Sequence, residues 1–191
     1  MIDFDEIQKF RVFNELKSVY RFNSVNDRKE SSAEHSWSCL ILADLILSLL
    51  DLNVDKLKVY ELLMYHDVVE IESGDTPLSP NVNRSHKKEL ELKSMLILKN
   101  KLPKALSEKA YNLFLEFDDQ KTMESKIAKA ISALDAEIHE MDYKKDWVGW
   151  TKDFLIQAKQ HYFEDIPELK DLFSKLLNYF EENNYFDSNV E

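Results

Sequence analysis

The stretch Tyr65–Pro77 reads YHDVVEIESGDTP and concentrates polar residues beside an apolar run, VYELLMY. His66 and Glu70 are four residues apart, so on a helix they lie on one face, one above the other. Asp67 lies close enough around such a helix for its side chain and that of His66 to approach one point. Burying a histidine and two carboxylates costs desolvation energy unless a partner such as a divalent cation compensates it. The simpler alternative is a histidine at a helix C-terminus, where its charge suits the helix dipole.

The end of the same stretch predicts a helix stop. Glycine is the usual residue just after a helix, so the helix expected over residues 55–72 ends at Gly74. The short SGDTP turn then places Asp75 just past the helix end. The following DTPLSPNVN contains two prolines, which exclude a regular helix, and is expected to be a loop.

Helical spacing of apolar residues continues in both directions from this stretch. Two glycines and four prolines in 191 residues leave few sharp turns, which argues against an all-β sandwich or barrel. No convincing strand pair is found, and RFNSVNDRKE (residues 21–30) is interpreted as a charged loop. The sequence predicts one all-α domain over residues 1–191, a bundle of about eight helices. The expected helices cover residues 3–19, 33–50, 55–72, 84–100, 103–117, 123–145, 151–163 and 167–181.

Composition narrows the classes of protein. With 44% hydrophobic and 12% aromatic residues the chain can bury a sizeable core. A net charge of −11 disfavours nucleic acid and anionic membranes as partners, and an anionic substrate would need a local positive trap. The only cysteine, Cys39, lies in an apolar run and is interpreted as a small core residue. The N-terminus does not resemble a signal peptide and the longest apolar stretch, near residues 40–50, is too short for a bilayer, so a cytoplasmic protein is expected.

Two residues elsewhere in the chain are candidates to meet the Tyr65–Pro77 stretch. His35 falls in the first turn of the helix expected over residues 33–50. If that helix is antiparallel to the next one, its start lies near the end of the helix that carries His66. Asp135 is the sole acid in an apolar run, Ala128–Ala136, that is expected to face the core. A lone acid there is costly unless it is paired or coordinated.

The order H…HD…D, given by His35, His66–Asp67 and Asp135, resembles the signature of the HD-domain metal-dependent phosphohydrolases. The segments LKSVYR, RKESSAEHS, YHDVVEIESGDTP and KAISALDAEI are similar to those of the YfbR-like 5′-deoxynucleotidases, over about residues 10–145. The resemblance implies an all-helical HD domain, in agreement with the expected helices. It also implies that the four residues of the signature bind one metal ion.

Two imidazoles and two carboxylates make a mixed donor set. Such a set suits Co²⁺, Mn²⁺, Fe²⁺, Ni²⁺ or Zn²⁺ better than Mg²⁺ or Ca²⁺. Because no thiolate belongs to it, it does not resemble a structural zinc site. An octahedral ion would keep two positions open, one for a phosphate oxygen and one for water.

A phosphate dianion would need a further cation, because the two carboxylates neutralise the charge of the metal. Arg21 and Arg28 precede His35 and are the candidates, since a guanidinium matches phosphate oxygens bidentately. By the family pattern, Arg21 resembles the phosphate clamp and Phe22 resembles a position that lines the nucleoside pocket. The alternative for either arginine is a solvated loop charge.

Two acids are candidates for catalysis. Glu70 lies one turn beyond His66, where it could orient or deprotonate the attacking water. Asp75 resembles the family aspartate that contacts the substrate or the leaving oxygen, and Gly74 would let the backbone bend towards it. Both acids could instead support the metal ligands or form the turn, and the assignment of acid and base stays open.

The resemblance implies a metal-dependent phosphomonoesterase that hydrolyses nucleoside 5′-monophosphates, with any preference for deoxynucleotides resting on the resemblance alone. One alternative is another HD phosphohydrolase that acts on a tri- or tetraphosphate. Against it, Ile71 departs from the H-D-x-x-E-D pattern of enzymes that hydrolyse guanosine tetraphosphate, and the acidic chain offers few obvious cations for a triphosphate. A non-catalytic helical module with a structural metal is the other alternative. The resemblance suggests a homodimer, and the helices within about residues 150–182 are expected to complete the core or to supply the interface.

Three further residues are expected to have structural roles. His139 lies four residues after Asp135 and is interpreted as a surface or packing histidine. Trp147 and Trp150 flank Gly149 and are expected to pack a helix joint rather than to bind a base.

Overall fold

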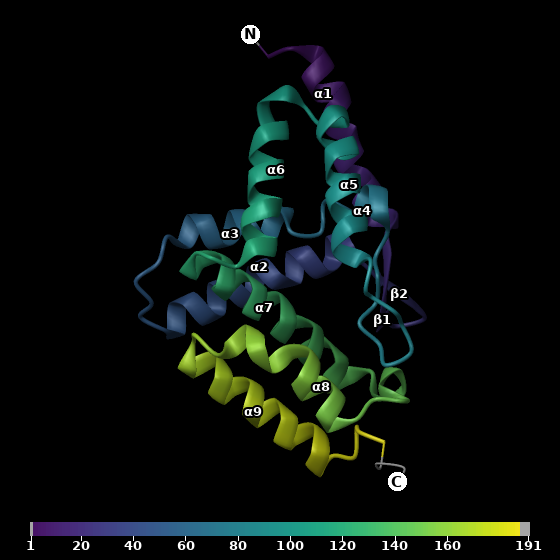
Figure 1. Cartoon of the computed structure of the whole chain (residues 1–191), viewed down its shortest axis with the longest axis vertical. Coiled ribbons are helices and arrows are strands. Elements are labelled where there is room, and N and C mark those ends of the chain that lie inside the picture. Colours follow the sequence, from purple (N-terminus) through teal and green to yellow (C-terminus); the bar gives the residue numbers. More distant parts are fainter. Residues whose placement is uncertain (1, 188–191) are drawn as a thin grey trace.

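The computed structural model describes residues 2–187 and is predominantly helical, which confirms the predicted all-α class. Long helices make up most of the structure, and shorter helical segments connect them (Figure 1). The α-helices are α1 (Phe4–Phe10), α2 (Ser32–Leu49), α3 (Lys56–Tyr65), α4 (Glu70–Ser73), α5 (Lys87–Lys101), α6 (Lys104–Asp119), α7 (Met123–His139), α8 (Lys152–Lys159) and α9 (Pro167–Glu182). The 3₁₀ segments are η1 (Arg11–Ser18), η2 (Glu140–Asp142), η3 (Lys144–Trp147) and η4 (Gln160–Phe163).

Helix α7 lies at the centre of the molecule. It packs against α2, α3 and α6 on one side and against η4 and α9 on the other. In Figure 1, α5 and α6 project together towards the N-terminus, while α8 and α9 cover α7 from the opposite side. The apolar core is continuous from Leu16 in η1 to Phe180 in α9. Because nearly every side of α7 is covered, polar residues on it need partners or a cavity.

The C-terminal helices pack into this core. Phe163 and Phe173 stack with ring centroids 4.5 Å apart, and both side chains are fully buried with Phe180. Trp147 and Trp150 pack edge to face at 5.7 Å, and Trp147 also packs on Phe180 at 4.5 Å. These aromatic side chains therefore join the C-terminal helices to the rest of the core, and the tryptophans pack the joint after η3 as predicted.

Residues 21–30, expected as a charged loop, lie in a hairpin instead. Strands β1 (Tyr20–Val25) and β2 (Arg28–Ser31) pair antiparallel, with Val25 opposite Arg28. Asn26 in the two-residue turn has φ 52°, in the left-handed region that asparagine tolerates. Strand alternation makes Arg21 more buried than Phe22. A strand, rather than a loop, therefore carries Arg21, at an irregular part of the pairing between Tyr20 and Ser24.

The helix expected over residues 55–72 is interrupted at its functional end. Helix α3 stops just before His66, and a tight turn leads into α4 at Glu70, with the Glu70 N–H donating to the Asp67 carbonyl at 2.9 Å. The His66 ring binds the Leu63 carbonyl, which in a continuous α-helix would accept from the Asp67 N–H. In this turn of about three residues, the side chains of Asp67 and Glu70 point in the same direction. The continuous helix expected from the sequence would instead have placed Glu70 on the same face as His66.

Other element ends follow the sequence closely. Ser31 and Glu34 form the predicted capping box at the start of α2. Gly74 ends α4 with φ 70°, as expected for a glycine after a helix. The helix expected over residues 123–145 is shorter than predicted: α7 stops at His139 and continues as 3₁₀ segments. Within residues 2–187, no helix has both the length and the apolar character needed to cross a bilayer.

Candidate metal centre and substrate pocket

The structure brings the four predicted ligands, His35, His66, Asp67 and Asp135, into one buried cluster. His35 comes from the start of α2, Asp135 from the middle of α7, and the other two from the turn after α3. His35 Nδ1 lies 2.8 Å from Asp135 Oδ2, and His66 Nε2 lies 3.2 Å from Asp67 Oδ1. The two imidazole rings meet edge to face with centroids 5.3 Å apart. Three segments far apart in the sequence thus supply donors to one place.

Neighbouring groups hold the two imidazoles in position. His66 Nδ1 is 2.7 Å from the Leu63 carbonyl, so this nitrogen carries the proton and Nε2 presents a lone pair to the cluster. Ser132 Oγ lies 3.3 Å from the Nε2 atoms of both His35 and His66. Ser38 donates to Asp135 Oδ1 at 2.6 Å. Such supporting hydrogen bonds are what orient the ligands of a metal site.

The protonation states also suit metal binding. Burial lowers the pKa of His35 to about 4 and lowers that of His66, so both imidazoles are neutral near pH 7. Burial would raise the pKa values of Asp67 and Asp135, but both are lowered, because the two carboxyls lie beside the histidines and the Arg21 charge and because His35 donates a hydrogen bond to Asp135. Neutral imidazoles and ionised carboxylates are the forms that ligate metals.

Cys39 lies beside the same cluster without being part of the predicted set. Its Sγ is 3.5 Å from His35 Nε2 and shares with His35 and His66 a space small enough for one ion. Burial raises the pKa of the Cys39 thiol well above its ordinary range, so the sulfur is a thiol in this structure. The sulfur therefore packs against the His35 ring, and the nitrogen and oxygen donors around it fit a divalent metal ion.

Arg21 enters the site from β1. Its Nη1 lies 3.4 Å from Asp67 Oδ2, and its Nε lies 3.1 Å from Glu30 Oε2 on the neighbouring strand. Burial alone would lower the pKa of Arg21, but the carboxylates of Asp67 and Glu30 outweigh burial and raise it. The guanidinium is permanently charged, and only one of its edges faces Asp67. Glu30 was not predicted, although the alternation of a strand would have placed it beside Arg21.

Of the other two residues of this region predicted to bind the substrate, Phe22 lies at the pocket and Arg28 does not. Phe22 lines the pocket at its edge, with the Lys29 ammonium 4.7 Å from its ring centroid. Arg28 is not brought to the pocket: its guanidinium binds the Glu34 carboxylate on the surface, with Nη1 2.8 Å from Oε2. The hairpin twist that turns Arg21 inward leaves Arg28, at the turn, facing solvent.

Glu70 and Asp75 both line the pocket beside the cluster. Burial, followed by the charges of Asp67 and Asp75, raises the pKa of Glu70 well above its ordinary value. Ser32 Oγ donates to Glu70 Oε2 at 2.6 Å and fixes its orientation. Burial also raises the pKa of Asp75, although the Arg21 charge opposes the shift. Two carboxyls that hold protons more readily than usual thus flank the ligand cluster.

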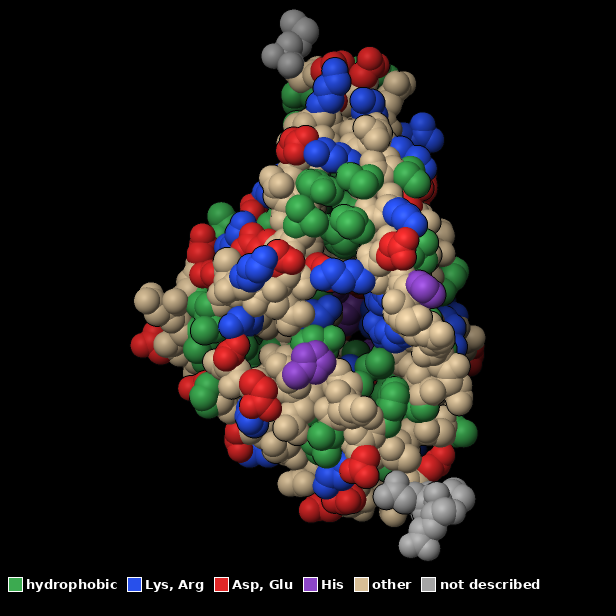
Figure 2. Space-filling view, in the orientation of Figure 1, with side chains coloured by type: hydrophobic (Ala, Val, Ile, Leu, Met, Phe, Trp, Pro, Cys, Tyr) green, Lys and Arg blue, Asp and Glu red, His purple; other side chains and the backbone are tan. Residues whose placement is uncertain are grey.

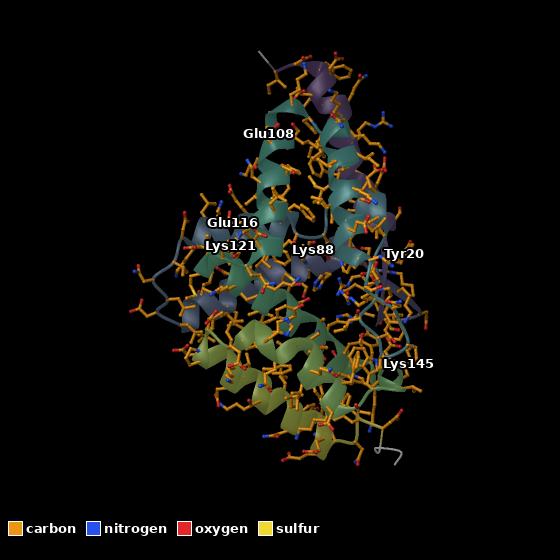
Figure 3. The ribbon with its side chains drawn as sticks, in the orientation of Figure 1. Tyr20, Lys88, Glu108, Glu116, Lys121 and Lys145 are labelled. Atoms are coloured by element: carbon orange, nitrogen blue, oxygen red, sulfur yellow. The ribbon has the colours of Figure 1, made fainter. Side chains whose placement is uncertain are left out.

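The cluster opens into a cavity of about 370 Å³, large enough for a small organic ligand. Figure 2 shows a hollow in the middle of this face with Lys and Arg side chains around it and a histidine inside. Three cations of this pocket, Arg84, Lys87 and Lys129, were not predicted. Lys88 on α5, labelled in Figure 3, reaches towards α6, and its Nζ lies 2.6 Å from Asp118 Oδ2. The acidic chain therefore contains a local group of cations at the metal end of its pocket.

Lys129 is the most notable of these cations. Its ammonium lies over the rings of Phe117 and Tyr162, 4.6 and 5.4 Å from their centroids. Burial, followed by the charge of Lys87, lowers its pKa to about 8. Among residues 2–187 no carboxylate lies within ion-pair distance of it. The sequence signal was a lysine one turn before Ser132 on an otherwise apolar helix face.

The far end of the pocket, formed by Glu137, Glu140, Asp146, Trp147 and Lys159, is acidic. Lys159 forms a buried ion pair with Glu137 and donates to the Ala133 carbonyl at 3.1 Å. Lys29 Nζ, on β2, lies 3.6 Å from Asp146 Oδ2. Figure 3 shows Tyr20 of β1 and Lys145 of η3 on the same side of the molecule, where β1 contacts η3. Nearby, His139 forms no hydrogen bond with the proposed metal ligands. Its Nε2 lies 2.7 Å from the Ser24 carbonyl, which fits the predicted packing role.

Glu140 makes a pH-dependent contribution to stability. Burial, followed by the charges of Asp146 and Glu137, raises its pKa to about 8. Between the ordinary value of 4.5 and about 8, the folded state therefore holds a proton that the unfolded state has lost, and stability falls as pH rises through this window. Between mildly acidic and mildly alkaline pH, the Tm of the native protein should fall by about 2–4 °C or more beyond any fall in the Tm of Glu140→Gln. Thermal melts at several pH values test this, and parallel curves for the two proteins would contradict it.

The fold and the metal-binding arrangement define a helical domain with a histidine–aspartate centre, and comparison with known proteins gives its class. The chain belongs to the HD domain family: the family model described as "HD domain" matches residues 13–176. Its curated relatives include 5′-deoxynucleotidase HDDC2 of Danio rerio, 27% identical over 173 residues, which covers 87% of this chain and 85% of the relative. The human 5′-deoxynucleotidase HDDC2 is 25% identical over 175 residues, with 89% and 83% covered.

Solved structures share the fold. A protein from Magnetospirillum magnetotacticum MS-1, described as a predicted metal-dependent phosphohydrolase, superposes with a TM-score of 0.83 at 24% identity and covers 98% of this chain and 100% of its own. An HD-domain phosphohydrolase from Listeria innocua gives a TM-score of 0.60 at 20% identity, with 92% and 85% covered. The arrangement of helices around α7 is therefore the arrangement of known HD domains.

Proposed function

We propose that this protein is a metal-dependent phosphomonoesterase that hydrolyses deoxynucleoside 5′-monophosphates to nucleoside and phosphate. The observation that carries the proposal is the convergence of Arg21 with His35, His66, Asp67 and Asp135 in one cavity. That cavity has the size of a nucleotide site. The curated relatives named 5′-deoxynucleotidase support the same substrate class. The preference for deoxy over ribo substrates rests on those names.

In this proposal His35, His66, Asp67 and Asp135 hold one divalent transition metal, whose identity among Co²⁺, Mn²⁺, Fe²⁺, Ni²⁺ and Zn²⁺ is open. When bound, the metal supplies Lewis-acid polarisation of the phosphate and lowers the pKa of a water molecule. Arg21 binds phosphate oxygens through the guanidinium edge that does not face Glu30, and it adds the charge that a dianion needs. Phe22 covers the pocket edge beside the nucleoside.

The proposed reaction is an in-line attack of water on phosphorus. A new P–O bond forms as the bond from phosphorus to the 5′ oxygen breaks. Glu70, in its ionised form and held in orientation by the Ser32 hydrogen bond, takes a proton from the attacking water. Asp75, whose pKa is also raised by burial, gives a proton to the leaving 5′ oxygen. Water thus supplies the oxygen of the phosphate, and the two carboxyls exchange their protons with solvent afterwards.

Lys129 is expected to strengthen substrate binding, because among residues 2–187 its ammonium has no carboxylate partner and it lies in the pocket with Arg84 and Lys87. Lys129→Met should lower kcat/KM for nucleoside monophosphates by about 10–100-fold, mainly through KM, as expected for loss of a charged contact. Steady-state assays of phosphate release measure this. Lys126→Met is the matched control, because Lys126 lies on the same helix but pairs with Asp165 at the surface. Equal losses in both variants would contradict the role of Lys129.

The same cations favour a second candidate function. Arg84, Lys87 and Lys129 give the pocket more positive charge than the acidic composition suggested, so the objection to a polyphosphate substrate is weaker than the sequence indicated. Lys87, however, is paired with Glu91, and the pocket beyond the metal end is acidic. A monophosphate with a neutral nucleoside matches this polarity better than a triphosphate does.

The decisive experiment is a substrate survey. The purified protein is analysed for bound metal and assayed for phosphate release from all deoxy- and ribonucleoside monophosphates with added Co²⁺ or Mn²⁺, and from the corresponding triphosphates. We expect release from monophosphates, fastest for the deoxy forms. Equal rates on ribo- and deoxynucleotides would reject the deoxy preference alone. Bound metal without release from any nucleotide would favour a non-catalytic metal-binding module.

A homodimer and a cytoplasmic location are part of the same proposal. Trp37, Ile41, Leu45 and Leu49 recur every four residues on α2 and are more than half exposed, which supports a self-association face there. The helices within about residues 150–182, the other candidate for the interface, bury much of their apolar surface in the core. Molar mass measured by light scattering tests the dimer.

A further inference from the structure

The loop between α4 and α5 carries a cation that the proposed reaction does not use. Arg84 lines the pocket and is half-buried, and among residues 2–187 no carboxylate lies within ion-pair distance of its guanidinium. Two hydrogen bonds define the turn that presents it: the Ser85 N–H donates to Asn83 Oδ1 at 2.9 Å, and the Lys87 N–H donates to the Arg84 carbonyl at 3.0 Å. An arginine held at a cavity in this way is suited to bind an anionic group of a ligand.

Two further side chains share this part of the pocket with Arg84. Lys87 is the first residue of α5, and Tyr162 comes from η4. Burial raises the pKa of the Tyr162 hydroxyl, and the charges of Arg84 and Lys87 oppose this shift, so both cations lie near the hydroxyl. The hydroxyl keeps its proton near pH 7 and can donate a hydrogen bond. Because the Lys87 ammonium also pairs with Glu91, Arg84 is expected to contribute most to binding an anion.

This group lies beside the place of the phosphate that is hydrolysed. Arg21 faces Asp67, and its guanidinium fork can take two of the three terminal oxygens of a phosphate monoester. Lys129 belongs to the same place, since its charge interacts with that of Asp67. Burial raises the pKa of Asp75, and the charges of Arg21 and Arg84 both oppose the shift, so the two places are neighbours. With one phosphate contacted by Arg21 and Lys129, Arg84 is left for a second anionic group.

Asp75 indicates to what that second anionic group is attached. It is the proposed proton donor to the leaving oxygen, and the Arg84 charge acts on it, so Arg84 lies on the leaving-group side of the reacting phosphate. The 5′ oxygen of a sugar is strongly basic and leaves with a proton from an acid, whereas the leaving oxygen of a diphosphate is far less basic and needs no such donor. The second group is therefore carried by the sugar, and deoxyribose has only its 3′ hydroxyl left to carry it. The neutral base then extends towards the acidic far end of the pocket.

We propose that Arg84, together with Lys87 and Tyr162, binds a phosphate on the 3′ oxygen of the substrate, so that deoxynucleoside 3′,5′-bisphosphates are hydrolysed in preference to 5′-monophosphates. Water attacks the 5′ phosphorus and the bond from this phosphorus to the 5′ oxygen breaks. The products are inorganic phosphate and the deoxynucleoside 3′-monophosphate, and the 3′ phosphate stays on the sugar. This subsite rests on the proposed nucleotidase function and specifies its substrate class.

The test compares deoxyadenosine 3′,5′-bisphosphate with deoxyadenosine 5′-monophosphate and with deoxyadenosine 5′-diphosphate, all with the same base. We expect kcat/KM of the native protein for the bisphosphate to exceed that for the monophosphate by about tenfold or more, mainly through KM, as expected for a charge-assisted contact. Chromatography should identify deoxyadenosine 3′-monophosphate as the product. Arg84→Met should bring the ratio of the two kcat/KM values close to one.

Arg28→Met is the matched control, because it also removes one guanidinium from the chain but at the surface, where Arg28 binds Glu34. It should keep the native ratio. Equal native rates on the bisphosphate and the monophosphate, or a ratio that persists in Arg84→Met, would overturn the subsite while leaving the nucleotidase function intact. Faster hydrolysis of the 5′-diphosphate than of the bisphosphate would overturn the 3′ assignment.

An equilibrium measurement tests the subsite without catalysis. The native protein should bind deoxyadenosine 3′-monophosphate about tenfold or more tightly than deoxyadenosine, and Arg84→Met should bind the two with similar affinity. Absence of hydrolysis of every nucleotide would reject the nucleotidase function, and the binding measurement would then decide on the subsite alone. Equal affinities of the native protein for the two compounds would overturn it.

Discussion

Replacing Asp67 with alanine is expected to abolish phosphate release and to remove most of the bound metal. The Asp67 carboxylate contacts both a proposed metal ligand and the proposed phosphate-binding arginine: it lies 3.2 Å from His66 Nε2 and 3.4 Å from Arg21 Nη1. Losing it removes a proposed ligand and leaves Arg21 without one of its two carboxylates. Loss of metal-assisted catalysis is worth several kcal/mol, and because each 1.36 kcal/mol is tenfold, we expect kcat/KM to fall by about 10³-fold or more.

Two measurements distinguish this result from simple unfolding. Metal content by mass spectrometry should fall in Asp67→Ala, while circular dichroism should show an unchanged helical spectrum. Glu72→Gln is the matched control, because Glu72 belongs to the same stretch but pairs with Lys101 at the surface. It should keep both metal and activity. Treatment of the native protein with a chelator should imitate Asp67→Ala, and added Mn²⁺ or Co²⁺ should restore only the native protein. Full activity in Asp67→Ala would reject the proposed ligand set.

Replacing Arg21 with methionine is expected to give the second-largest loss. The guanidinium is the only cation within hydrogen-bond distance of Asp67 in the described part of the chain, and it is fixed by Glu30 at 3.1 Å. Without it a phosphate dianion loses a charge-assisted bidentate contact, and kcat/KM should fall by about 10²–10³-fold. Arg21→Lys keeps the charge without the planar fork, so it should recover part of this loss.

Arg28→Met is the control for this prediction. Both arginines lie on the hairpin, but the Arg28 guanidinium binds Glu34 at the surface. Its replacement should leave kcat/KM within about a factor of two, since exposed ion pairs contribute little. Because Arg21→Met also leaves Glu30 buried without its partner, thermal melts should be compared with those of Glu30→Gln. Equal activity losses in the Arg21 and Arg28 variants would contradict the assignment of Arg21 as the clamp.

The sequence was most informative where chemistry and local structure coincide. His35 follows a capping box, His66 and Asp67 precede a glycine stop, and Asp135 is a lone acid in an apolar run, so each could be found without knowing the fold. The helices were predictable for the same reason, since their apolar spacing and their caps are local signals. The break at His66 was not, because it depends on a ring nitrogen taking the Leu63 carbonyl from the backbone.

The features that escaped prediction depend on long-range contacts. The hairpin strands are short and charged, and their inward alternation is visible only once Glu30 is paired with Arg21. Lys129 on α7, and Glu140 just past its end, gave no sign in the sequence that they line a cavity. Only the placement of Tyr162 and Trp147 against them shows that they do. Sequence periodicity identifies which residues share a face, but it does not identify what lies opposite.

The central position of α7 separates two tasks along one helix. Ser132 contacts two of the proposed ligands and Asp135 is itself one, whereas Glu137, and Glu140 just past the helix end, meet side chains that arrive after residue 140. Trp147 and Lys159 thus shape the far end of the pocket without contacting the proposed ligands. Such an arrangement allows lineages to diversify their substrates by substitutions in the C-terminal third while the hydrolytic apparatus is inherited unchanged.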